Sequence, residues 1–424
     1  MKIKIKKLSY DQVMQLPRAK HQRPIKPNWF FRTLVKCLSI GELKATHFQY
    51  ESVGMEKLGN DEPCLILMNH SSFIDLKIAS TIFKSRPFNI VCTCDGFVGK
   101  EWLMRHLGCI PTQKFVMDIT LLKDMLYTVK TLKDSILLFP EASYSFDGTA
   151  TPLPHSVAKC IKMLNVPVVM VRTYGAFTRD PLYNNLQVRK VDVSAKVTYL
   201  LSPEEIENKS IGQIQALLDE QFTFDHFKWQ QDSHLKVAEN FRADHLNRVL
   251  YKCPHCLTEG KMVGKGIYLT CKECGKVYEL TEEGCMKATK GKTEFDHIPD
   301  WYAWERQCVK EEILARKYGL KIPVAVYMMI DKKAIYQVGE GTLVHNNKGF
   351  RLTGCNGKLE YMQKPQASYS LYSDYYWYEI GDMICIGTQD TLYYCFPLQG
   401  EDVAAKTRLA TEELYKLVTR KKGQ

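Results

Sequence analysis

The stretch Cys64-Leu65-Ile66-Leu67-Met68-Asn69-His70-Ser71-Ser72-Phe73-Ile74-Asp75 passes from an apolar segment through a polar turn into a helical pattern. A short apolar run bounded by polar residues is typical of a buried strand, and the residues after the turn have helical spacing. The same order of strand and helix recurs as far as Leu201. It predicts an α/β unit with a mixed, largely parallel sheet, whose functional residues follow the carboxyl ends of the strands.

The expected elements follow this alternation. We expect strands at Cys64–Met68, Ile90–Thr93, Ile136–Phe139, Val166–Val171 and Val191–Leu201, and helices at Ser72–Lys84, Lys100–Leu107, Thr120–Lys133 and Ser156–Leu164. Polar residues suited to chemistry come directly after two of these strands, at Asn69-His70 and at Pro140-Glu141. A site is therefore expected where these two strands end side by side.

His70 and Asp75 are the candidate catalytic pair. On one continuous helix, five residues turn through about 500°, so the two side chains would not share a face. With His70 in the turn and Asp75 in the first helical turn, the carboxylate can reach one ring nitrogen and leave the other free to take a proton. The alternative is that Ser72-Phe73-Ile74-Asp75 is only a helix capping box beside an ordinary turn histidine.

Four motifs in order resemble those of the glycerolipid acyltransferase family, which includes 1-acylglycerol-3-phosphate acyltransferases. Asn69–Asp75 resembles the first motif, Asn-His-x-Ser-x-x-Asp, and Gly108–Lys114 resembles the second, Gly-x-Ile-Pro-x-x-Arg. Phe139–Ser145 resembles the third, Phe-Pro-Glu-Gly-Thr-Arg-Ser, and Val166–Val171 resembles the fourth, an apolar strand with a proline. The resemblance covers about residues 29 to 201.

The resemblance implies an O-acyltransferase that moves a fatty acyl group from acyl-CoA or an acyl-carrier protein to a lysoglycerolipid, with 1-acylglycerol-3-phosphate as the expected acceptor. In such an enzyme His70 would deprotonate the acceptor hydroxyl and Asp75 would orient His70. The residues expected to bind substrate are Asn69, Ser72, Lys114, Glu141, Tyr144 and Arg172.

Two positions of the third motif depart from the family. Tyr144 stands in place of its arginine and Ala142 in place of its glycine, while the second motif has Lys114 for arginine. Tyrosine cannot supply the bidentate, charged recognition of phosphate that arginine gives. Either another cation compensates, with Lys114, Arg172 and Arg179 as candidates, or the acceptor differs. Two alternatives stay open: a catalytically silent membrane- or partner-binding protein, and a hydrolase with water as acceptor.

Four of the fifteen cysteines have the spacing of metal ligands. Cys253 and Cys256 form one Cys-x2-Cys pair, and Cys271 and Cys274 form a second after fourteen residues. This pattern resembles a zinc ribbon and predicts a structural Zn²⁺ site, with a pair of redox motifs as the alternative. A zinc ribbon also suggests nucleic-acid binding as an alternative function. The acidic residues beside the downstream aromatic ones argue against it.

The chain is expected to have five parts. They are a basic arm at 1–27, the α/β acyltransferase domain at 28–202, a helical connector at 203–250, the zinc ribbon at 251–282, and a β-rich domain with a final helix at 283–424. Strands followed by one helix would also suit a pleckstrin-homology-like barrel.

Membrane lipids are the expected partner of the amino-terminal region. Residues 1–27 hold eight Lys or Arg and one acid, and residues 28–40 form an amphipathic helix that could lie in a bilayer interface. The alternatives are a solvated tail and a helix whose apolar stripe packs on the core. The sequence has neither a run of about 18 apolar residues nor a signal-peptide pattern. With its scattered, reduced thiols, this predicts a peripheral protein on the cytoplasmic membrane face, with an acyl-carrier protein as a further candidate partner.

Overall fold

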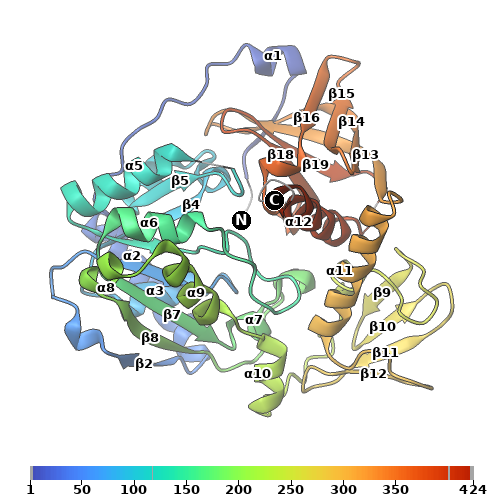
Figure 1. The fold of residues 1–424 in the computed structure, drawn as a ribbon, viewed down its shortest axis with the longest axis horizontal. Coiled ribbons are helices and arrows are strands. Elements are labelled where there is room, and N and C mark those ends of the chain that lie inside the picture. The colour runs from blue at the N-terminus through green and yellow to red at the C-terminus, as the bar shows by residue number, and fades with distance from the viewer. Residues whose placement is uncertain (1–2, 117, 400–401, 421–424) are drawn as a thin grey trace.

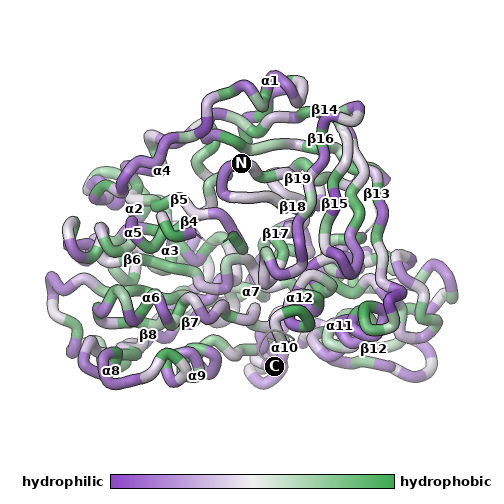
Figure 2. Tube along the Cα trace, turned by 45° about the horizontal axis from the view of Figure 1, so that its top comes forward, coloured by the Kyte–Doolittle hydropathy of each residue, from purple (hydrophilic) through white to green (hydrophobic). Residues whose placement is uncertain are grey.

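The computed structural model describes residues 3–116, 118–399 and 402–420, which form three sheets and the helices around them (Figure 1). Buried and more exposed residues alternate along the strand Gly319–Met329 of the carboxyl-terminal sheet, whose strands carry both hydrophobic and hydrophilic stretches (Figure 2). None of the helices in the described ranges combines the length and apolar character that crossing a bilayer requires.

The first sheet is the predicted α/β unit. Its seven strands lie in the order β2 (Gln49–Val53), β8 (Ser194–Leu201), β7 (Val168–Tyr174), β3 (Leu65–Met68), β6 (Ser135–Leu138), β4 (Phe88–Thr93) and β5 (Cys109–Thr112). All pairs are parallel except β7 with β8, so the expected mixed, largely parallel sheet is confirmed. Its helices are α2 (Trp29–Ala45), α3 (Asp75–Ile82), α4 (Glu101–His106), α5 (Ile119–Tyr127), α6 (Ser156–Leu164) and α7 (Ala176–Arg179).

Strand β5 was not among the predicted elements, because Pro111 argues against a strand. Proline lacks the N–H that a central strand must donate, but it is tolerated at the edge of a sheet. β5 is the edge strand here, and it contains Cys109–Thr112 of the second motif. The central strand β3 has all four residues buried, which explains its unbroken apolar sequence.

The connector is helical only as far as Asp232, with α8 (Pro203–Asn208), α9 (Ile211–Phe222) and α10 (His226–Asp232). After these helices the backbone bonds to the second sheet instead, as in Ala243 N–H to Gly266 O at 2.8 Å. That sheet holds β9 (Met262–Lys265), β10 (Tyr268–Cys271), β11 (Val277–Leu280) and β12 (Met286–Ala288), all antiparallel.

Helix α11 (Ile298–Leu314) lies in the part expected to be β-rich and was not among the predicted elements. Trp301, Glu305, Val309 and Ile313 are four residues apart and all buried, so they form its core-facing stripe. Glu305 interrupts the apolar pattern, which is why the sequence concealed the helix. Its carboxylate accepts a hydrogen bond of 2.8 Å from the backbone N–H of Lys252.

The third sheet has the order β16-β15-β14-β13-β19-β18-β17, and α12 (Ala404–Arg420) packs against it. The strands are β13 (Gly319–Met329), β14 (Ile335–Asn346), β15 (Gly349–Gly354), β16 (Leu359–Gln363), β17 (Tyr372–Trp377), β18 (Gly381–Gly387) and β19 (Leu392–Pro397). A β-rich part ending in a helix is therefore present, while a pleckstrin-homology-like barrel stays a prediction.

The described part of the amino-terminal arm packs against the rest of the protein. β1 (Ile5–Lys7) pairs in parallel with β14, and α1 (Tyr10–Met14) follows it. The chain then crosses to the α/β sheet, where the ring of His21 lies 3.0 Å from the carboxylate of Asp124. The arm thus fastens the third sheet to the first.

One hydrophobic core joins the parts of the chain. It contains Phe146 and Phe177 of the α/β unit, Cys253 and Cys271 of the ribbon, Trp301 of α11 and Leu409 of α12. Helix α12 lies between the α/β unit and the third sheet (Figure 1). Helix α12 is therefore packed close to the third motif.

Candidate active site

The imidazole of His70 lies where the sequence predicts it, in the turn between β3 and α3. Its Nδ1 is 3.1 Å from Oδ2 of Asp75, and the two side chains are 18% and 1% exposed. With Nδ1 as donor to the carboxylate, the free lone pair is on Nε2. Nε2 makes no hydrogen bond to any residue that the structure describes. In this geometry Asp75 orients His70 so that Nε2 can act as a general base.

Asp75 also fixes the turn. Its Oδ2 accepts hydrogen bonds from the backbone N–H groups of Ser71 at 2.8 Å and Ser72 at 3.1 Å. The contact with Ser72 is half of a capping box. The other half is missing, because Ser72 Oγ accepts from Ile74 N–H at 3.2 Å rather than from Asp75. Asp75 therefore caps the turn and orients His70 with the same oxygen.

Burial lowers the pKa of His70 below its usual value, and the hydrogen bond and charge of Asp75 only partly oppose this. The nearby charge of Lys114 lowers it further. An imidazole with a lowered pKa is neutral at pH 7 and can accept a proton.

Aromatic rings enclose His70 on two sides. The ring of Phe139 lies 4.3 Å from the imidazole centroid and that of Tyr144 lies 4.0 Å from it. Tyr144 therefore contacts the catalytic base itself. The neighbouring Ala142 has a φ of 58°, a left-handed conformation that glycine adopts without strain, which accounts for the glycine in the family motif.

Glu141 joins the third motif to the histidine turn. Its Oε1 accepts from the backbone N–H of His70 at 3.2 Å, and its Oε2 accepts from the backbone N–H of Thr151 at 2.9 Å. Burial raises the pKa of Glu141 to about 7, although both N–H groups and Arg408 favour the ionised form. Glu141 thus positions the backbone that carries the base.

Asn69 and Ser72 use their polar atoms on the protein. Asn69 Oδ1 accepts from the N–H of Thr173 on β7 at 2.8 Å, and its amide donates to Ser71 Oγ at 2.9 Å. Ser72 Oγ donates to the buried carboxylate of Asp180. These contacts hold the turn in shape, whereas their expected role in binding substrate stays a prediction.

The three candidate cations lie in different surroundings. Lys114 is half-buried, with its Nζ 4.4 Å from the ring centroid of Tyr372 on β17, and it makes no hydrogen bond or ion pair with the described residues. Arg172 instead bonds the carbonyl of Gln221 and lies over Phe224, and Arg179 pairs with Asp180 at 3.1 Å. Within the described ranges, no contact joins Arg172 to His70.

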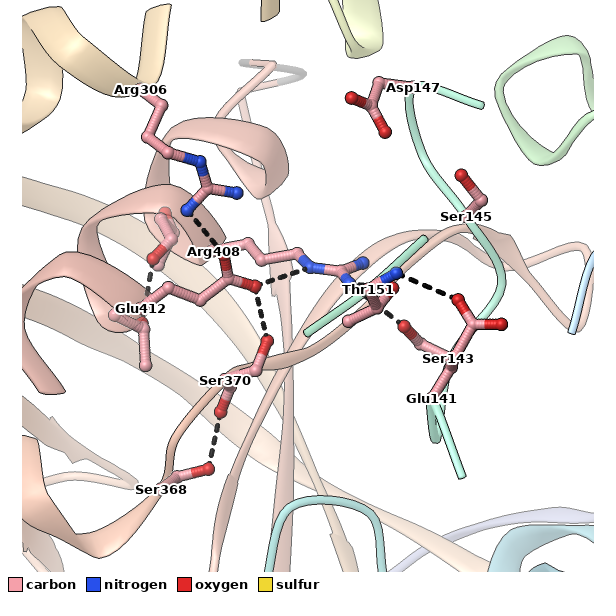
Figure 3. Close-up of polar contacts among 12 residues, drawn as sticks. Glu141, Ser143, Ser145, Asp147, Thr151, Arg306, Ser368, Ser370, Arg408 and Glu412 are labelled. Atoms are coloured by element: carbon pink, nitrogen blue, oxygen red, sulfur yellow. Dashed lines mark hydrogen bonds and ion pairs between the residues drawn. The ribbon is translucent and has the colours of Figure 1, made fainter. Parts of the chain in front are cut away.

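Sequence reasoning missed Arg408 of α12. Its Nη2 donates to Ser143 Oγ at 3.1 Å and to Thr151 Oγ1 at 3.2 Å, so its guanidinium lies against the third motif (Figure 3). Its Nε donates to Glu412 at 3.2 Å. The partners lie 265 residues apart in the chain, and no local pattern could have linked them.

The four predicted metal ligands come together in the second sheet. Their ligand atoms all lie within 4.8 Å of one another. The Sγ atoms of Cys253 and Cys274 are 3.8 Å apart, and those of Cys256 and Cys271 are 3.7 Å apart. Four thiolates around tetrahedral Zn²⁺ with bonds of about 2.3 Å would be about 3.8 Å apart. The donor set therefore fits a zinc ion.

Comparison with known proteins agrees with this geometry. Residues 49–173 match the family model described as Acyltransferase. Over 151 residues, or 34% of this chain and 42% of the relative, the sequence is 28% identical to a chloroplastic 1-acyl-sn-glycerol-3-phosphate acyltransferase of Brassica napus. The chain therefore spans less than half the length of this curated relative.

A solved structure gives a weaker likeness. The crystal structure of the 1-acyl-sn-glycerophosphate acyltransferase PlsC from Thermotoga maritima covers 45% of this chain and 76% of its own, with a TM-score of 0.36 and 15% identity. A likeness at this level places no residue of the present chain.

The α/β sheet, the histidine–aspartate pair after β3 and the match over residues 49–173 define an acyltransferase domain. Residues 49–173 thus match an acyltransferase family, and the curated relative supports the glycerolipid type that the four motifs predict.

Proposed function

We propose that the protein transfers a fatty acyl group from an acyl thioester, either acyl-CoA or acyl-carrier protein, to a hydroxyl of a lysoglycerolipid. The observation that carries this proposal is the His70 imidazole, which is bound to Asp75 through Nδ1 and has an uncommitted Nε2. A neutral imidazole in this arrangement serves as a general base, which typically contributes roughly 10²–10⁴-fold to a rate.

In the proposed reaction Nε2 takes the proton of the acceptor hydroxyl as its oxygen attacks the thioester carbonyl. The new C–O ester bond forms and the C–S bond breaks, and the thiolate leaves with the proton that His70 received. Asp75 stabilises the imidazolium between these two transfers. Glu141 keeps the His70 backbone in place through its 3.2 Å hydrogen bond.

The acceptor is proposed to be 1-acylglycerol-3-phosphate, within phospholipid biosynthesis. The curated relative is named for that acceptor, and Lys114, which has no ion-pair partner among the described residues, acts electrostatically on the base. The departure at Tyr144 means that a phosphate must find its second cation elsewhere.

The metal proposed for the ribbon is Zn²⁺, held by Cys253, Cys256, Cys271 and Cys274. Four protein ligands leave no open position, so such an ion would be structural. It would tie the second sheet to the core that it shares with α11 and α12.

Membrane lipids are the proposed partner, at the cytoplasmic face of a membrane. The exposed side of α2 carries Trp29 (73% exposed), Phe30, Leu34 and Leu38 (69% exposed), so this stripe does not pack on the core. Ring contacts continue from Phe30 through Phe31 to exposed Trp102 of α4. We call Trp29, Phe30, Leu34, Leu38 and Trp102 the apolar patch. The exposed cations of the arm, from Lys4 to Lys26, suit anionic headgroups.

A transfer assay with labelled acyl-CoA and a panel of lysoglycerolipids tests the proposal. We expect His70→Ala to lose at least about 100-fold in rate while it melts like the wild type. Wild-type rates in His70→Ala would refute the role of His70. No transfer by the wild type would favour the silent scaffold, and release of free fatty acid without any lysolipid would favour a hydrolase.

A further inference from the structure

The guanidinium of Arg408 stands beside the motif in which the arginine is missing. The ring of Tyr144 is engaged with His70, so it offers no cation to the third-motif loop. Arg408 reaches this loop from α12 through Ser143 and Thr151, and Thr151 also donates its N–H to Glu141 (Figure 3). A helix from the other end of the chain therefore contributes an arginine to the site.

Arg408 has donor capacity that the protein does not use. The side chain is 4% exposed and offers five N–H donors. Nε and Nη2 have the acceptors described above, but Nη1 is buried and has no acceptor within the described residues. Buried charged donors without an acceptor are costly and rare. Nη1 is therefore the donor of Arg408 that remains for an acceptor from a bound molecule.

Lys114 is the second cation of this region. Its burial lowers its pKa, Asp374 and Asp95 raise it, and the charge of Arg408 lowers it again, so Arg408 and Lys114 are close enough to repel each other. Lys114 likewise lowers the pKa of His70. The two cations and the base thus share one region, with Lys114 paired to no carboxylate in the described part of the chain.

The charge of Arg408 is only partly neutralised. Glu412 accepts from Arg408 at 3.2 Å, but it also accepts from Arg306 at 2.6 Å and from Ser370 Oγ at 2.6 Å (Figure 3). One carboxylate thus serves two guanidinium groups. An added anion would complete the pairing of Arg408 and Lys114 together.

We infer that Arg408 Nη1 and Lys114 bind a phosphate group of the substrate, so that the carboxyl-terminal helix supplies the arginine that the third motif lacks. The inference rests on the proposed function and deepens it. Two sources share this chemistry: the 3-phosphate of the acceptor and the phosphates of CoA. The acceptor is the source we favour, because the charge of Lys114 acts on His70 and Arg408 bonds Thr151, whose N–H holds the same Glu141 carboxylate as the His70 backbone.

Steady-state kinetics with the full chain tests the inference. Acceptors are 1-acylglycerol-3-phosphate and monoacylglycerol, which lacks phosphate, and donors are acyl-CoA and acyl-pantetheine, which lacks the CoA phosphates. We expect Arg408→Gln to raise the KM for 1-acylglycerol-3-phosphate roughly 10- to 100-fold, the worth of a charge-assisted hydrogen bond. The KM for monoacylglycerol should not change, and Arg408→Lys should restore part of the loss.

Arg306→Gln is the matched control. It removes the other guanidinium on Glu412, and Arg306 has no contact with the third motif among the described residues. The change therefore loosens the packing of α11 and α12 but leaves Arg408 in place. It should leave the preference for the phosphorylated acceptor intact. If Arg408→Gln raises only the KM for acyl-CoA, the phosphate site is supported, and the phosphate it binds belongs to the CoA donor. An equal loss of kcat on every substrate pair, with all KM values unchanged, would overturn the inference.

A binding measurement separates this inference from the proposed function. Calorimetric titration with glycerol 3-phosphate should give binding to the wild type and at least about tenfold weaker binding to Arg408→Gln. Equal affinities, or no binding to the wild type, would overturn the acceptor as the source of the phosphate. If the wild type and Arg408→Gln also bind CoA equally, the phosphate site itself is overturned, whatever the transfer assay shows. If the wild type binds glycerol 3-phosphate and transfers no acyl group, the proposed function fails and the phosphate site stands.

Discussion

The phenol ring of Tyr144 lies against the imidazole of His70, with ring centroids 4.0 Å apart and planes inclined by 31°. At the position where the family has an arginine, this chain has a tyrosine whose ring packs against the catalytic base. Tyr144 helps to bury His70, and burial is the main reason that the pKa of His70 is lowered. The replacement therefore bears on proton transfer as well as on phosphate recognition.

Replacing Tyr144 with alanine should raise the pKa of His70. Water would reach the imidazole and stabilise its charged form, so the acidic limb of the pH–rate profile should shift toward higher pH. Tyr144→Phe keeps the ring, and its acidic limb should stay close to that of the wild type. An acidic limb that is the same in Tyr144→Ala and Tyr144→Phe would contradict this account.

Glu141 should give the enzyme a second pH dependence, near pH 7. Burial raises its pKa to about 7, so Glu141 is ionised above that pH and protonated below it. Only the ionised carboxylate accepts fully from both His70 N–H and Thr151 N–H, so the transfer rate should fall as pH drops through about 7. A pH–rate profile of Glu141→Gln should start lower and show no limb there, leaving only the lower limb of His70.

Asp374 is the control for this assignment, because burial also raises its pKa to about 7. Asp374 and Lys114 each favour the charged form of the other, and Asp374 makes no contact with the His70 turn among the described residues. Asp374→Asn should therefore keep the limb near pH 7. If the limb disappears in Asp374→Asn and persists in Glu141→Gln, then Glu141 is not its source.

The sequence predicted the parts of the fold that depend on local pattern. The unbroken apolar strands β3, β6 and β7 and the helix α6 are where they were expected, because burial on both faces leaves a clear apolar run. β5 and α11 escaped detection for local reasons, namely a proline tolerated at a sheet edge and a glutamate buried in a helix stripe. In both cases tertiary contacts outweighed the local pattern.

The residues of the candidate site also divide into those that local motifs predict and those that only the structure reveals. His70, Asp75 and Glu141 lie within two short motifs, and the parallel pairing of β3 with β6 brings those motifs together. Arg408 comes from the opposite end of the chain, in a helix whose sequence has no motif. A contact that depends on the packing of α12 against the α/β unit leaves no trace in residue spacing, so only the structure could reveal it.

The apolar patch on α2 and α4 should govern membrane binding. Moving a large apolar side chain from water into an apolar environment is worth about 1.5–3 kcal/mol. We therefore expect Trp29→Ser and Leu38→Ser each to weaken co-sedimentation with anionic vesicles by roughly tenfold or more. Leu314→Ser is the control, since Leu314 is 60% exposed but lies on α11. Equal loss in all three variants would show that the patch has no special role.

Loss of zinc should loosen the helix that carries Arg408. Cys253 and Cys271 belong to the same core as Leu409 of α12, so an unligated ribbon would weaken the packing on which the position of α12 depends. Metal analysis should find about one zinc per wild-type chain and none in Cys271→Ser, because three remaining ligands rarely hold a structural zinc. The melting temperature of Cys271→Ser should fall by several degrees, and its affinity for glycerol 3-phosphate should fall with it.

Cys285→Ser is the control that distinguishes the effect of losing zinc from the general effect of removing a thiol. Cys285 is half-buried in the same sheet region but lies outside the four-cysteine cluster, so its replacement should keep both the zinc and the melting temperature. If Cys271→Ser loses zinc yet melts and binds glycerol 3-phosphate like the wild type, the ribbon does not support α12. The coupling between ribbon and active site would then be wrong, although the metal site itself would be established. Phe146, the residue after the third motif, lies in the same core, so we expect loss of zinc to weaken both the packing of α12 and the binding of glycerol 3-phosphate.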